Sequence, residues 1–125
     1  MKTIVKNYDI NASKTKVYEA LTDQKIIESW SGSPAKMDLA EGGEFSLWGG
    51  TIHGVNHKIT QDQIIQDWKE EKWEAFSKCT FNLDESDGVT HLELVHEDIP
   101  DGSAKSIDNG WDIYYLGPLK ELLEK

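Results

Sequence analysis

Alternation of apolar and polar positions dominates the middle of the chain. A period of two residues is typical of β-strands that bury one face. The pattern predicts strands at Thr3–Ile10, Glu44–Trp48, Thr51–Ile59, Gln63–Lys69, Ala75–Leu83 and Val89–His96. The Gly49-Gly50 pair is typical of a two-residue hairpin turn, and residues 84–88 predict a second turn. Consecutive strands joined by short turns indicate an antiparallel sheet.

Two short helices are predicted after the first strand. Ser13 is a good N-cap for a helix over Thr15–Leu21, because its hydroxyl can accept from a free backbone N–H. Asp23 can cap a second helix that ends at Trp30, where Gly and Pro follow. Apolar residues recur at helical spacing in both, so each helix has one face to bury.

A longer helix is predicted from Ser106 to Leu123. Its apolar stripe is wide and aromatic, and consists of Ile107, Trp111, Tyr114, Tyr115, Pro118, Leu119 and Leu122. Gly117-Pro118 lies inside the helix and predicts a kink, because proline lacks the N–H that the helix needs. An antiparallel sheet with one face to cover and a long helix with a matching stripe predict an α+β fold.

Length and charge narrow the class of protein. The chain has 125 residues, which is the size of one domain, and we expect residues 1–125 to form it. The formal net charge is -10 and all 13 basic residues are lysine, so nucleic-acid and anionic-membrane partners are not expected. The N-terminal residues lack the apolar core of a secretion signal, and Cys79 is the only cysteine, so we expect a cytoplasmic protein.

Reactive side chains give weak signals. His53 and His57 have a spacing that binds zinc on a helix, but on a strand they lie ~13 Å apart. We therefore interpret the histidines, including His91 and His96, as residues of the surface or of a pocket rim. Cys79 is on an apolar strand face, which indicates a buried and inert thiol. Glu93 and Glu97 could serve as acids in a closed cavity, but an outward orientation is favoured.

Four segments resemble one known family. They are residues 17–23 (VYEALTD), residues 41–48 (EGGEFSLW) with Gly50 and Gly54, Trp68-Lys69 with Trp73, and Ile99-Pro100 with Gly110-Trp111 and Tyr114-Tyr115. Together with the element order they resemble the heat-shock protein 90 ATPase activator homolog family, within the Bet v 1/START-like superfamily. The resemblance is to the C-terminal type of domain in the eukaryotic activator. It implies a helix-grip fold, in which a curved sheet wraps a long C-terminal helix and leaves a cavity. Gly54 allows a bulge or bend that curls the sheet.

The leading hypothesis is a small non-catalytic domain that binds an apolar or aromatic molecule in this cavity. The expected lining residues are Trp30, Phe45, Trp48, Phe81, Trp111, Tyr115 and Leu119. Whether the aromatic side chains line an open cavity or fill a closed one stays open. The alternatives are a protein-interaction module of chaperone or stress responses, and an enzyme similar to polyketide cyclases. No catalytic residue, cofactor or metal ligand is predicted.

Overall fold

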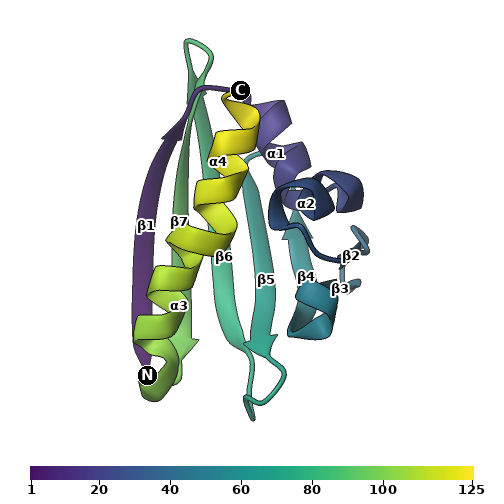
Figure 1. The fold of residues 1–125 in the computed structure, drawn as a ribbon, viewed down its shortest axis with the longest axis vertical. Coiled ribbons are helices and arrows are strands. Elements are labelled where there is room, and N and C mark those ends of the chain that lie inside the picture. The colour runs from purple at the N-terminus through teal and green to yellow at the C-terminus, as the bar shows by residue number, and fades with distance from the viewer.

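Seven strands form one antiparallel sheet, and a long C-terminal helix lies across one of its faces (Figure 1). The computed structural model describes the whole chain, residues 1–125. The elements are β1 (Lys2–Ile10), α1 (Lys14–Thr22), α2 (Gln24–Ser31), β2 (Lys36–Met37), β3 (Glu44–Leu47), η1 (Trp48–Gly50), β4 (Ile52–Ile59), β5 (Gln63–Glu70), β6 (Ser77–Ser86), β7 (Val89–Ile99), η2 (Asp101–Ser103), α3 (Ala104–Gly110), η3 (Trp111–Leu116) and α4 (Gly117–Leu123). The strand order is β1-β7-β6-β5-β4-β3-β2, so the first strand pairs with the last. The predicted α+β helix-grip fold is confirmed.

The lengths of the two predicted hairpin turns are wrong: the turn at residues 84–88 is shorter than predicted, and the turn at Gly49-Gly50 is longer. The β6–β7 turn contains only Asp87 and Gly88, both at positive φ, and Ser86 pairs with Val89. An Asp-Gly pair at positive φ is what a tight two-residue turn requires. The Gly49-Gly50 turn is longer than predicted, because Leu47 pairs with Ile52 and a 3₁₀ turn begins at Trp48.

Strand β4 has two irregular positions, a close approach to β5 at Gly54 and a register shift after Asn56. A Cβ at Gly54 would lie 1.8 Å from the carbonyl oxygen of Asp67, so only glycine allows the close approach of β4 to β5. The bulge itself lies further along, where the register shifts between Asn56 and Lys58 and leaves His57 as the extra residue. His53 and His57 are therefore separated by a bulge as well as by strand distance.

The long C-terminal helix consists of α3, the π-helical turn η3 and α4 in succession. A kink is predicted at Gly117-Pro118; the structure shows this wider turn, which ends at Leu116, directly before Gly117. A Cβ at Gly117 would lie 2.1 Å from the carbonyl oxygen of Asp112, so the π-turn requires glycine there. The wide turn places Trp111, Tyr115 and Leu116 in the core together.

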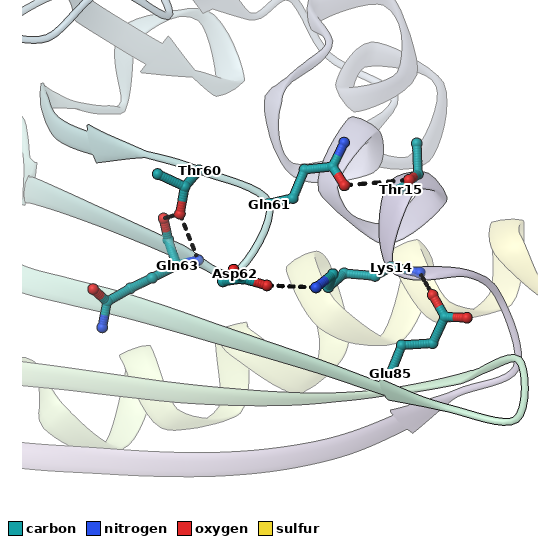
Figure 2. Close-up of polar contacts among 7 residues, drawn as sticks. All are labelled: Lys14, Thr15, Thr60, Gln61, Asp62, Gln63 and Glu85. Atoms are coloured by element: carbon teal, nitrogen blue, oxygen red, sulfur yellow. Dashed lines mark hydrogen bonds and ion pairs between the residues drawn. The ribbon is translucent and has the colours of Figure 1, made fainter.

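The two short helices close one end of the structure. The predicted caps are confirmed: the Ser13 side chain accepts from Lys16 N, and the Asp23 side chain accepts from Lys25 N and Ile26 N. Figure 2 shows how the start of α1 is fixed to two hairpins. The backbone N–H of Lys14 donates to Glu85 at 2.7 Å, and the Lys14 side chain forms an ion pair with Asp62.

The core lies between the sheet and the helices and contains 26 buried hydrophobic residues in one cluster. Burial alternates along β6, where Ser77, Cys79, Phe81 and Leu83 are buried, as the sequence pattern predicts. No helix is long and apolar enough to cross a membrane.

Candidate functional site

A cavity of about 350 Å³ lies beside α3 and η3, at the end of the sheet where β4 begins and β5 ends. Its lining residues are Trp48, Thr51, Ile52, Trp68, Glu70, Ser106, Ile107, Gly110, Trp111, Tyr114 and Tyr115. The helix supplies one wall and the β4–β5 hairpin supplies the other. The volume is within the range of small-molecule sites, which begins at roughly 300 Å³.

Three of the seven predicted lining residues, Trp48, Trp111 and Tyr115, line this cavity. The side chains of Trp30, Phe81 and Leu119 are also buried on the inner side of the sheet, but they fill the core beside the cavity. Phe45 is buried near Gly54 on the neighbouring strand, and its ring would lie 2.8 Å from a Cβ at that glycine. The aromatic stripe therefore fills the core at one end and lines open space at the other.

Four of the five aromatic side chains that line the cavity form one continuous cluster with Trp30 in the core; the fifth, Tyr114, is largely exposed. The ring centroid of Tyr115 lies 4.6 Å from those of Trp111 and Trp30, and 6.1 Å from that of Trp48. Trp68 stacks on Trp111 at 5.5 Å. Ring separations of 4.5–7 Å are typical of favourable aromatic pairs, so each ring restrains the next. This part of the cavity wall is thus packed against the core.

A buried hydrogen-bonded chain fixes the orientation of Trp111. Its Nε1 donates to His96 Nδ1 at 3.0 Å, and His96 Nε2 lies 2.7 Å from Ser77 Oγ. An indole N–H can only donate, so Nδ1 must accept and the ring proton must lie on Nε2. Ser77 Oγ then accepts from Nε2–H and donates to the carbonyl oxygen of Trp68. The side-chain nitrogen and oxygen atoms of Trp111, His96 and Ser77 therefore all have hydrogen-bond partners.

Burial of His96 keeps its imidazole neutral. The side chain has no exposed surface, and this desolvation lowers its pKa to about 3. The interpretation of His96 as a residue of the surface or pocket rim is wrong, because the alternation of β7 directs it to the core with Leu92 and Leu94. With both ring nitrogens engaged, His96 positions Trp111 and offers no free base.

The other candidate side chains lie where the favoured interpretation put them. His57 and His91 are exposed and pair with Asp67 and Asp9. Cys79 is fully buried, and burial raises the pKa of its thiol well above the usual value. Glu93 is on the outer face of β7, where it accepts from Asn82 Nδ2 at 3.0 Å. No group of three or more His, Cys, Asp or Glu side chains could hold a metal ion.

Sequence reasoning missed several lining residues, above all Trp68 and Glu70. The alternation of β5 would have indicated Trp68, which shares a face with Ile64 and Gln66. Trp68 Nε1 is buried without a hydrogen-bond partner, and no other buried side-chain nitrogen or oxygen lacks one. A buried donor without an acceptor costs about 1–3 kcal/mol.

Comparisons with a family model and with curated proteins point to the same family. The model of the family described as "Activator of Hsp90 ATPase homolog 1-like protein" matches residues 11–124. An activator of 90 kDa heat shock protein ATPase homolog from Dictyostelium discoideum is 27% identical over 124 residues, which cover 95% of this chain and 32% of that protein. The human homolog 1 is 23% identical over 112 residues, which cover 87% of this chain and 33% of that protein.

Solved structures are similar over almost the whole chain. An HSP90 activator from Plasmodium falciparum is 27% identical with a TM-score of 0.94, covering 98% of this chain and 96% of that chain. CalU16 from Micromonospora echinospora is 26% identical with a TM-score of 0.84, covering 96% and 73%. The chain spans about a third of the length of the curated relatives it matches. It belongs to the family of Activator of Hsp90 ATPase homolog 1-like proteins.

Proposed function

We propose that this domain binds a small apolar or aromatic molecule in the cavity between α3, η3 and the β4–β5 hairpin. The observation that carries the proposal is the cavity itself, about 350 Å³ in volume and lined mainly by hydrophobic side chains. A wall held by the Trp111–His96–Ser77 chain supports it, since a preformed site loses little entropy on binding.

The test uses a neutral fluorescent probe, N-phenyl-1-naphthylamine, and a variant that fills the cavity. Gly110 lines the cavity, and a Cβ there would meet only Tyr114, at 4.0 Å. We expect Gly110→Leu to weaken probe binding about tenfold or more, because the added side chain occupies ligand volume. Gly102→Leu is the matched control, since Gly102 is outside the lining and a Cβ there meets nothing within 4 Å. Equal probe binding by wild type and Gly110→Leu, or none by wild type, contradicts the proposal.

Docking to a chaperone is the second candidate function. Several relatives are named as activators of a 90 kDa heat-shock protein ATPase, and this chain covers 96% of the solved chain of the P. falciparum activator. The net charge of -10 suits a basic docking surface, because opposite charges steer association. The ATPase rate of a purified 90 kDa heat-shock protein, with and without the domain at low and high salt, tests this role. No change in rate and no complex at low salt would exclude it.

A further inference from the structure

The charge of the cavity lining is one-sided, and this indicates the class of ligand. Eleven residues line the cavity, and the only one with an ionisable acid is Glu70. No lysine or histidine is among them. A buried or half-buried anion needs a cationic partner or several donors, so the site is a poor one for a carboxylate or phosphate group. The ligand is therefore neutral or positively charged.

The Glu70 carboxylate has no partner within the protein. None of the ion pairs in the structure uses it. The neighbouring Lys69 is committed elsewhere, since its Nζ donates to the carbonyl oxygen of Trp73 at 2.6 Å and lies 5.6 Å from the centroid of Phe76. Glu70 is half-buried at the end of β5 and is one of the residues that line the cavity. It is thus an unpaired negative charge at the edge of an apolar cavity.

Aromatic side chains supply the rest of the recognition. Trp48, Trp68, Trp111, Tyr114 and Tyr115 all line the same cavity. The π-systems of such rings attract a cation within about 6 Å, and tryptophan does so best. Several aromatic rings around one space, with a carboxylate at the edge, are the arrangement by which proteins bind alkylammonium groups.

From this combination we propose that the cavity binds an organic cation, an ammonium group carried on an aromatic or apolar body. The inference rests on the proposed function, because it names the ligand class of that same cavity. The ammonium group lies among the aromatic rings next to Glu70. The hydroxyls of Thr51 and Ser106 are also in the lining and can accept from a bound N–H group. A ligand of the same shape without the charge loses the cation–π and carboxylate contacts.

Three molecules of equal shape separate charge from hydrophobicity. They are benzyltrimethylammonium, the neutral 2,2-dimethylpropylbenzene and the anionic phenylmethanesulfonate. Each is titrated against the protein loaded with N-phenyl-1-naphthylamine, at a salt concentration near 0.15 M that screens the general negative charge of the chain. We expect the cation to displace the probe with an affinity about tenfold higher than the neutral molecule, and the anion to be the weakest.

Two variants assign the preference to the cavity. Glu70→Gln is expected to lower the affinity for the cation about threefold to tenfold and to leave the affinity for the neutral molecule unchanged. Glu74→Gln is the matched control, because Glu74 is exposed, outside the lining and equal in charge, and it is expected to change neither. Equal affinity for cation and neutral molecule, tightest binding of the anion, or equal effects of the two variants would overturn the inference. If the probe does not bind at all, the proposed function fails first and takes the inference with it.

Discussion

For Gly117→Ala, helix propensity predicts a more stable protein and the structure predicts a less stable one. Gly117 joins η3 to α4 with φ -60° and ψ -56°, values that alanine adopts readily. Propensity alone predicts that alanine stabilises a helix interior by about 1 kcal/mol relative to glycine. In the structure, however, the new Cβ would lie 2.1 Å from the carbonyl oxygen of Asp112, a backbone atom that cannot turn away.

The size of the effect follows from what has to move. Contacts of Cβ below 3.0 Å are essentially never found, so the backbone of the π-turn must shift by about 1 Å. Overpacking of this kind costs roughly 1–3 kcal/mol, which equals or exceeds the gain of about 1 kcal/mol in helix propensity. Rewinding the π-turn into an α-helix is no escape, because a shift of one residue rotates α4 by about 100°. That rotation would remove the fully buried Leu119 from the core.

We therefore expect Gly117→Ala to lower the free energy of unfolding by up to about 2 kcal/mol. Urea unfolding followed by tryptophan fluorescence and far-UV circular dichroism measures it, with linear extrapolation to water. Gly110→Ala is the matched control in the same long helix. A Cβ at Gly110 meets only Tyr114, at 4.0 Å, so this variant should gain about 0.5–1 kcal/mol. If both variants move in the same direction, the steric account of the π-turn is refuted.

Two further predictions concern buried titratable groups. Because the pKa of His96 is about 3 when folded and about 6.5 when unfolded, the unfolded state binds the extra proton between these values. His96 should therefore make stability fall by about 1.4 kcal/mol per pH unit as the pH drops from 6.5 to 3. The urea midpoint of His96→Phe should fall less steeply than that of the wild type as the pH drops over this range. Parallel plots of midpoint against pH for the two proteins would contradict the prediction. The Cys79 thiol should not react with a disulfide reagent at pH 8 until the protein unfolds, since burial raises its pKa; rapid reaction of the native protein would show that the strand opens.

Much of the fold was predictable because period and capping are local properties. The strand predicted at Thr3–Ile10 lies at Lys2–Ile10, and the helix capped by Asp23 lies at Gln24–Ser31. Alternation along Ala75–Leu83 also gives the correct buried face of β6, although the strand itself is Ser77–Ser86. In each case the signal is contained in a few consecutive residues, so no tertiary information is needed.

The site was predicted less well because its residues are set by register and by the path of the helix. Trp111 and Tyr115 share a helix face in the sequence, but only the fold decides whether they meet open space or Phe81. The role of His96 depends on its pairing with Cys79 across β6 and β7, which puts Ser77 within hydrogen-bond distance. Pairings of this kind join residues about twenty positions apart, and the sequence pattern does not specify them.

The cavity exists at one end of the grip because the helices cover the sheet unequally. Helices α1 and α2 pack against α4, and the contacts of Lys14 with Asp62 and Glu85 fix them over that end (Figure 2). At the end where β4 begins and β5 ends, α3 lies over β1 and β7, and the cavity occupies the space between the helix and strands β4 and β5 (Figure 1). The apolar stripe continues along the whole helix: Leu119 on α4 is buried in the core, whereas Trp111, Tyr114 and Tyr115 on η3 line the cavity. The cavity therefore arises because the apolar stripe of the C-terminal helix extends beyond α4, the segment against which α1 and α2 pack.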